Sequence, residues 1–340
     1  MSKKLVLTVI AILAIGALVA GSATAFAAAK PSKVAYVING ALGDQSFFDS
    51  GYAGLQKIAK DFGVQTRVVE AKETSSLYYP SILQAAKWAD VIFVISYGME
   101  DQLKKIADMY PTKTFVNLDT VVANSKKTIS SVDFREEEGS FLAGAAAALM
   151  TTYTDLKGIN PEKVVGAVGG TDDPVIKNFM YGYEQGAKYI DPEMKIDVVY
   201  TGTFADPVKG KQAALQIYSR GADVVFQVAG LTGAGVLQAA KETGKYAIGV
   251  DGNQNGLEPG HVLTSDLKEV GSAMYGMYKK ILDGTYKKGV VYSYGVKEKA
   301  VGLAIDDYSK KLMPESVIKK LTDIADKIVK GEIKVKEFKP

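Results

Sequence analysis

Carboxylates, aromatic rings and glycines follow the short apolar runs of this sequence in excess. Asp44, Phe47 and Phe48 come after the run 34–38, and Asp251 follows the run 246–250. An ionised carboxylate accepts short, charge-assisted hydrogen bonds, and an aromatic face packs on a flat ring. Ligands bind at the carboxyl ends of strands in open parallel sheets, so these residue types predict a small-molecule site.

Similar residues follow other apolar runs or lie within the helical patterns. The further candidates for ligand contact are Tyr97, Asp119, Asp133, Phe179, Phe204, Gly230 and Lys268. A glycine has no Cβ and lets the backbone approach a ligand. Each aspartate also suits a helix cap or turn, and each phenylalanine also suits the core, so both interpretations stay open.

The composition excludes much of ordinary enzyme chemistry. The chain has one histidine, His261, and no cysteine, so most zinc sites and most cysteine or serine–histidine nucleophiles are excluded. Residues 251–256 match the first half of a calcium loop, but Val262 stands where a bidentate glutamate is required. We therefore expect no catalytic residue, no metal and no cofactor.

Short β-branched runs alternate with helical patterns along the first part of the chain. Strands are predicted at 34–38, 65–70, 91–96 and 114–118, and helices at 47–62, 77–88 and 99–110. Continuous apolar strands that alternate with helices indicate a parallel sheet covered on both faces.

The same rhythm restarts at an alanine-rich helix. Helices are predicted at 136–150, 174–189, 208–219 and 233–243, strands at 164–168, 196–200, 224–228, 246–250 and 262–265, and then a helix at 268–282, a strand at 290–294 and a helix at 316–329. The fold class predicted is α/β, with two doubly wound parallel-sheet lobes.

The lobes are expected to exchange chain through hinges rather than through a linker. After a signal segment about 310 residues remain, more than one core usually supports, and no Gly/Ser or Pro-rich linker divides them. We place the crossings at 132–134, 265–266 and 292–296. The N-terminal lobe then comprises 33–132 with 266–292, and the C-terminal lobe 134–264 with 296–340.

The N-terminus has the pattern of a secretion signal. Lys3 and Lys4 precede an apolar run from Leu5 to Gly21, and small residues follow at 25–27. The run is short for a membrane span, so we predict a signal peptide at 1–29, with an uncleaved anchor as the alternative. The protein is expected in the periplasm or on the outer face of the cytoplasmic membrane.

The charge balance argues against nucleic acid as a partner. The formal net charge is +3, and it falls to +1 without Lys3 and Lys4. A nearly neutral chain with mixed charges has no electrostatic footprint for nucleic acid or an anionic surface. No helix-turn-helix pattern precedes the first strand, so a DNA-binding regulator is disfavoured. We separately expect the protein to be a monomer.

Seven segments in order resemble the basic membrane protein family, the purine nucleoside receptors of ABC importers. They are GDQSFFDSGYAGL (43–55), EEEGSFLAGAAAAL (136–149), GGTDDPVIKNFMYGYEQGAK (169–188), YTGTFADPVKGKQAA (200–214), ADVVFQVAGLTGAGVLQAAKE (222–242), IGVDGNQ (248–254) and LTSDLK (263–268). The likeness covers nearly the whole chain after the signal. It implies a bilobal type I binding-protein fold that closes on a nucleoside.

The resemblance implies a role for each candidate residue. Asp251 would hold two ribose hydroxyls, with Lys268 donating to a ribose oxygen, and Asp44 with Asp119 or Asp133 would face the base edge. The base would stack between Phe47 or Phe48 and a second ring, and Gly230 would admit the ligand to the backbone. The second-ring candidates are Phe179 and Phe204, with Tyr97 capping the cleft.

Two other ligand or function classes stay open. Phe48 stands where the family usually has asparagine, and paired aromatics also resemble sugar-binding relatives, so a sugar or other small polar metabolite is the alternative ligand. A nucleoside hydrolase using Asp172, Asp173 and Asp251 around a calcium-bound water is the enzyme alternative. For a receptor, the expected partner is the membrane permease of an ABC importer.

Overall fold

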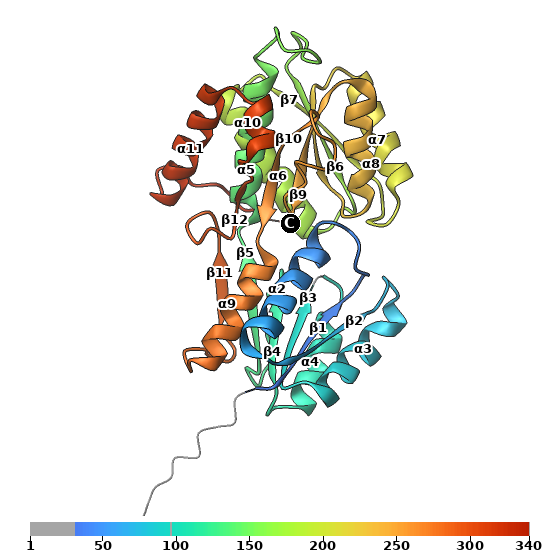
Figure 1. Ribbon diagram of the computed structural model, residues 1–340, viewed down its shortest axis with the longest axis vertical. Coiled ribbons are helices and arrows are strands. Elements are labelled where there is room, and N and C mark those ends of the chain that lie inside the picture. Colours follow the sequence, from blue (N-terminus) through green and yellow to red (C-terminus); the bar gives the residue numbers. More distant parts are fainter. Residues whose placement is uncertain (1–30, 96, 340) are drawn as a thin grey trace, which may run out of the picture. The chain divides into compact units, whose positions relative to one another are not determined.

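Two six-stranded sheets organise the chain in the computed structural model, which describes residues 31–95 and 97–339 (Figure 1). The first sheet has the order β11-β5-β4-β3-β1-β2, and all its strands are parallel. Its strands are β1 Lys33–Ile38, β2 Gln65–Glu70, β3 Val91–Ile95, β4 Thr114–Leu118, β5 Ile129–Phe134 and β11 Val291–Tyr294. The predicted signal peptide lies outside the described residues.

The second sheet has the order β12-β10-β9-β8-β6-β7. Its strands are β6 Val164–Gly169, β7 Lys195–Tyr200, β8 Val224–Val228, β9 Tyr246–Asp251, β10 Val262–Lys268 and β12 Val301–Leu303. All pairs are parallel except β10 with β12, which is antiparallel. The predicted α/β fold with parallel sheets is thus confirmed, with one antiparallel edge strand that was not predicted.

Helices cover both faces of the first sheet. In β3, Phe93 and Ile95 join the cluster under two helices, whereas Ile92 and Val94 join the cluster under the other two. The first pair is α2 Phe47–Phe62 and α9 Val270–Leu282, and the second is α3 Ser75–Trp88 and α4 Glu100–Met109. A strand buried on both faces must be apolar at every position, which explains its continuous run.

The second sheet is covered in the same way. One face carries α5 Glu136–Thr151, α6 Pro174–Ile190, α10 Asp307–Leu312 and α11 Glu315–Val329, and the other carries α7 Pro207–Ser219 and α8 Thr232–Thr243. Helices α5 and α6 pack closely because Gly144 has no side chain: a Cβ there would lie 2.0 Å from the Tyr183 carbonyl oxygen. Helix α6 begins at Pro174 because the Asp173 carboxylate accepts the N–H groups of Val175 and Ile176.

The chain passes between the sheets at three short connections. Only Arg135 separates β5 from α5, only Glu269 separates β10 from α9, and residues 295–300 join β11 to β12. Lys268 was predicted to begin a helix, but it ends β10, and α9 begins at Val270. The predicted lobe boundaries stay a prediction. Of the described helices, none combines the length and apolar character that a membrane span requires.

Candidate functional site

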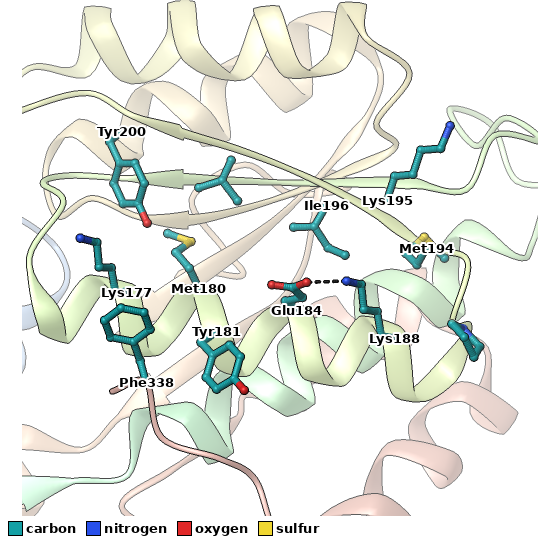
Figure 2. A pocket seen from close by; sticks show the side chains of 12 residues that line it. Lys177, Met180, Tyr181, Glu184, Lys188, Met194, Lys195, Ile196, Tyr200 and Phe338 are labelled. Atoms are coloured by element: carbon teal, nitrogen blue, oxygen red, sulfur yellow. Dashed lines mark hydrogen bonds and ion pairs between the residues drawn. The ribbon is translucent and has the colours of Figure 1, made fainter. Parts of the chain in front are cut away.

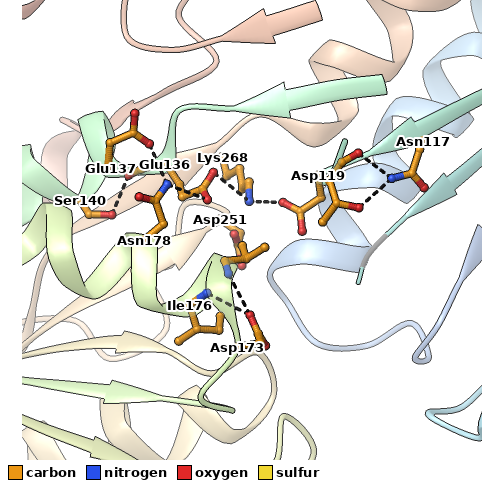
Figure 3. Close-up of polar contacts among 12 residues, drawn as sticks. Asn117, Asp119, Glu136, Glu137, Ser140, Asp173, Ile176, Asn178, Asp251 and Lys268 are labelled. Atoms are coloured by element: carbon orange, nitrogen blue, oxygen red, sulfur yellow. Dashed lines mark hydrogen bonds and ion pairs between the residues drawn. The ribbon is translucent and has the colours of Figure 1, made fainter. Parts of the chain in front are cut away.

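A buried group of charged residues lies where strands of the two sheets end. Asp119 follows β4 of the first sheet, whereas Asp251 and Lys268 are the last residues of β9 and β10 in the second. Figure 3 shows the Lys268 side chain between Asp119 and Glu136, with Asp251 beside it. The topology therefore brings together side chains that are far apart in the sequence.

Lys268 is the centre of this group. Its ammonium donates a hydrogen bond to the Asp119 carboxylate, and the two side chains are only 2% and 7% exposed. Burial alone lowers the pKa of Lys268, but the carboxylates of Asp119, Glu136 and Asp251 outweigh it and raise that pKa above its usual value. Lys268 is therefore a charged donor at any physiological pH.

Three aromatic rings surround the same ammonium. The Lys268 Nζ lies 5.5 Å from the ring centroid of Phe47, 5.3 Å from that of Phe134 and 5.0 Å from that of Phe179. Cations are attracted to ring faces at such distances, most strongly where water is excluded. Two of the predicted stacking residues, Phe47 and Phe179, are thus beside the predicted ribose donor.

Asp251 connects the two sheets through a second contact. Its Oδ2 accepts a hydrogen bond of 2.7 Å from the Oγ of Ser46, the residue that precedes α2. Burial raises the pKa of Asp251 to about 7, although Lys268 and the Ser46 hydroxyl act to lower it. Gln254 Nε2 donates to the Gln45 carbonyl oxygen at 3.1 Å in the same region.

Backbone strain is concentrated at this junction. Asp119, Asp251 and Gln45 have φ values of 86°, 61° and 51°, in the left-handed region that disfavours side chains. Such conformations persist where surrounding structure enforces them and are typical of ligand-binding sites. Here they turn the two aspartates out of their strand ends and toward Lys268.

Asp44 has a structural role in this conformation. Its carboxylate accepts the backbone N–H groups of Ser46, Phe48 and Asp49 at 3.1, 2.9 and 3.1 Å, which caps the first turn of α2. Burial raises the pKa of Asp44 despite these bonds. Asp44 therefore makes the contacts of a turn or cap residue. Its role toward a ligand stays a prediction.

The remaining predicted aromatic residues lie at different depths. The rings of Phe47 and Phe48 are 5.4 Å apart and tilted by 55°, and both are half-buried. Phe179 is buried and packs on Phe226, with ring centroids 6.5 Å apart. Phe204 is half-buried against the edge of its own core.

Three other candidates lie at the edge of the charged group or away from it. Gly230 has φ 53° and lies against Phe204, whose carbonyl oxygen would be 3.4 Å from a Cβ. Tyr97 is 49% exposed, and its carbonyl oxygen accepts a hydrogen bond of 3.1 Å from Asn39 Nδ2. Asp133 is half-buried; burial and the nearby Glu337 raise its pKa, against the effect of Lys268.

Sequence reasoning missed two buried carboxyl groups and the amide that joins them. Glu136 and Glu137 begin α5, and Asn178 Nδ2 donates to Glu136 Oε1 at 3.1 Å and to Glu137 Oε2 at 2.9 Å (Figure 3). Burial raises the pKa of Glu136 to about 8 and that of Glu137 to about 7. The available signal was a run of three glutamates before an alanine-rich helix.

A surface hollow lies away from the charged group. A cavity of about 700 Å³ runs between α6 and β7, lined by residues that include Tyr181, Tyr200 and Phe338 (Figure 2). The second, of about 300 Å³, lies near β12 and α11. None of the predicted ligand residues lines either of them. We therefore locate the candidate site by its buried charges and backbone strain, not by the volume of a hollow.

The charged group is suited to holding a small polar molecule. It offers the buried cation of Lys268, several acceptor oxygens and aromatic faces, of which Phe179 is buried and Phe47 half-buried. Within residues 31–95 and 97–339, no three His, Asp or Glu side chains are grouped to hold a metal ion.

The chain is similar to known proteins over almost its whole length. Residues 31–339 match the family described as ABC transporter substrate-binding protein PnrA-like. Basic membrane protein A1 of Borrelia garinii subsp. bavariensis is 32% identical over 308 residues, covering 88% of this chain and 87% of that protein. The ABC transporter nucleoside-binding protein BmpA of Lactococcus lactis subsp. cremoris is 32% identical over 353 residues, covering 95% and 97%.

A solved structure agrees with these relatives. The ABC transporter system solute-binding protein from Aeropyrum pernix K1 superposes with a TM-score of 0.83 at 26% identity. The match covers 91% of this chain and 94% of that chain. The similarity thus includes both sheets and the helices around them.

Proposed function

The chain belongs to the family of PnrA-like ABC transporter substrate-binding proteins, and we propose that its ligand is a purine nucleoside. The observation that carries this proposal is the buried group of Lys268, Asp119 and Asp251 beside the rings of Phe47 and Phe179. A nucleoside has both a diol and a flat base, and this group offers a partner for each. The relative from Lactococcus lactis is named as a nucleoside-binding protein, which supports the same choice.

Asp251 and Lys268 form the ribose end of the proposed site. A carboxylate accepts hydrogen bonds from two adjacent hydroxyls, and the ammonium donates to a sugar oxygen. The hydroxyl of Ser46, 2.7 Å from Asp251 Oδ2, occupies one acceptor position of that carboxylate. A ribose hydroxyl would take its place or share the second oxygen.

The base end of the proposed site is formed by Asp119 and the rings. Asp119 accepts an N–H of the base edge while it holds Lys268, with Asp44 and Asp133 as the outer carboxylates. The base stacks between Phe47 or Phe48 and Phe179 or Phe204, each contact contributing about 1 to 3 kcal/mol. Gly230 admits the base to the backbone, and Tyr97 covers the opening.

Ligand binding is proposed to stabilise a closed arrangement of two lobes. Ser46–Asp251 and Asp119–Lys268 join residues of different sheets, so both contacts break if the sheets separate. A nucleoside that contacts both sides favours the closed state by its differential affinity. The closed surface then docks on the membrane permease of an importer, whose ATPase supplies the energy.

We further propose where the protein acts and that it does not convert its ligand. The protein acts as a monomer outside the cytoplasmic membrane, delivered by the predicted signal peptide, and binds its ligand without converting it. It needs no cofactor, metal or nucleic acid. A sugar in place of the nucleoside is the alternative that the experiment must separate.

The experiment is identification of the molecule that purified protein carries. The protein is denatured directly after purification, and the released small molecules are identified by mass spectrometry. A purine nucleoside in near-stoichiometric amount supports the proposal. Release of a sugar instead, or steady production of free base from added nucleoside, would overturn it.

A further inference from the structure

A buried carboxyl oxygen beside Lys268 has no hydrogen-bond partner. Among the described residues, Oε2 of Glu136 is buried and makes no hydrogen bond. The Glu136 side chain is enclosed, with the whole residue only 6% exposed. Buried polar atoms are nearly always paired, so an orphan of this kind needs an explanation.

Lys268 does not supply that partner. Its Nζ is 3.8 Å from Glu136 Oε2, too far for a hydrogen bond, and its bond goes to Asp119 instead. The other groups facing Glu136 are Asp119 after β4, Asp266 on β10, Asn178 on α6 and its helix neighbour Glu137. Apart from the Asn178 amide, these groups are three carboxyl groups, those of Asp119, Asp266 and Glu137.

Asn178 determines which oxygen of Glu136 is available. The Asn178 Oδ1 accepts the backbone N–H of Phe338 at 2.8 Å, which fixes its Nδ2 as the donor toward Glu136 Oε1. The C-terminal segment holds this arrangement, because Lys336 exchanges two backbone bonds of 2.8 and 2.9 Å with the Gln185 side chain. Oε1 is thus committed as an acceptor, and Oε2 is left to face Lys268.

We propose that Glu136 is a further ligand-binding residue and that its Oε2–H donates a hydrogen bond to an acceptor atom of the nucleoside. The carboxylates of the site accept hydrogen bonds, whereas a purine base also presents ring nitrogens that need a donor. Asn178 is the positioning residue that keeps Oε2 directed at the ligand. This inference rests on the proposed function, since it names a contact within the same site.

The protonation state of Glu136 fits the role of donor. Burial raises the pKa of Glu136 to about 8, because the effect of Lys268 in the opposite direction is smaller. At neutral pH the carboxyl is therefore protonated. Since Oε1 accepts from Asn178, the proton is on Oε2.

The test is calorimetric titration of the full chain with inosine, guanosine and adenosine between about pH 6 and about pH 9. Wild-type affinity is expected to fall above about pH 8, approaching tenfold per pH unit. Glu136→Gln keeps a donor in the same place, so it should bind within about threefold of wild type at pH 7 and lose the alkaline fall. Glu136→Leu should bind at least about tenfold more weakly.

Proton uptake gives a measurement on the wild-type protein alone. Above about pH 8, titrations in two buffers of different ionisation enthalpy should show uptake of protons as the nucleoside binds. Glu184→Gln, an exposed glutamate on α6 that pairs with Lys188, is the control and should behave as wild type. Asn178→Ala removes a hydrogen bond that lowers the pKa of Glu136, so its alkaline fall should move to higher pH.

The possible results separate this inference from the proposed function. If wild-type protein binds no nucleoside at any pH, the proposed function fails and this inference fails with it. If wild type binds nucleoside without proton uptake above about pH 8, or if Glu136→Gln keeps the alkaline fall, only the role of Glu136 is overturned.

Discussion

Lys268, the last residue of β10 in one sheet, donates a hydrogen bond to Asp119, which follows β4 in the other sheet. Both side chains are buried, so the pair is protected from solvent screening. The bond joins residues 149 positions apart. In the proposed function it connects the ligand site to the closure of the two lobes. Removing Lys268 or Asp119 should therefore change both ligand binding and closure.

Lys268→Met tests the cation. It leaves the buried Asp119 carboxylate without its partner, and breaking a buried pair costs about 3 to 5 kcal/mol. We expect nucleoside binding to be lost and the urea midpoint of unfolding to fall. Lys188→Met, which removes an exposed partner of Glu184, is the control and should cost less than about 1 kcal/mol. Equal stability of the two variants would contradict the central position of Lys268.

Asp119→Asn tests closure. The amide keeps the shape but loses the charge-assisted bond to Lys268, so the contact between the sheets is weaker. We expect affinity for the nucleoside to fall about tenfold or more and the ligand-free protein to be more open. Calorimetry measures the first effect and small-angle X-ray scattering the second. An unchanged radius of gyration together with unchanged affinity would show that the Lys268–Asp119 pair does not stabilise the closed state.

Asp251→Ala tests the ribose end. If Asp251 holds two hydroxyls, its removal should cost several kcal/mol of binding free energy, roughly 1.5 to 3 for each charge-assisted bond. The ligand gives an independent check, because 2′-deoxynucleosides should bind at least about tenfold more weakly than ribonucleosides to wild type and equally to Asp251→Ala. Discrimination against the deoxy analogue that persists in the variant would place the ribose elsewhere.

The stability of the ligand-free protein should decrease as pH rises. The pKa values of Asp251 and Glu137 are raised to about 7, and unfolded carboxyl groups titrate near about 4, so the folded state binds more protons between these values. The stability that these groups contribute is complete below about pH 4 and is lost as pH rises through about 7. Urea unfolding at about pH 5.5 and about pH 8.5 should give the higher midpoint at the lower pH. Asp251→Asn should reduce that difference, and an identical difference would show that Asp251 does not titrate in this range.

The fold was predictable because its inner strands are buried on both faces. Every residue of Val91–Ile95 is apolar and fully buried, and successive side chains pack under opposite helical layers. The extension of β10 to Lys268 was missed. Asp266 and Leu267 pair with β9 as well as with β12, but Lys268 pairs only with Val301 of β12, a strand of three residues that is too short to give a period. Lys268 was consequently placed in a helix.

The site was predictable only in part. Asp251 follows an apolar run and Lys268 stands at a predicted crossing, and the structure places both side chains in the charged group. Their role toward a ligand stays a prediction. The bond between Lys268 and Asp119 depends on how two sheets meet, which no local pattern encodes. Glu136 was missed because acidic residues in a first helical turn usually complement the helix dipole at the surface.

The nucleoside site is tested most directly by calorimetric titration of ligand-stripped wild-type, Asp251→Ala and Lys268→Met proteins. Each protein is titrated with a purine nucleoside and, in parallel, with ribose and glucose. We predict saturable one-site binding of the nucleoside to wild type, an affinity at least about a hundredfold lower in both variants, and no binding of either sugar at the same concentrations. Binding of a sugar without nucleoside, or nucleoside binding that survives both substitutions, would contradict it.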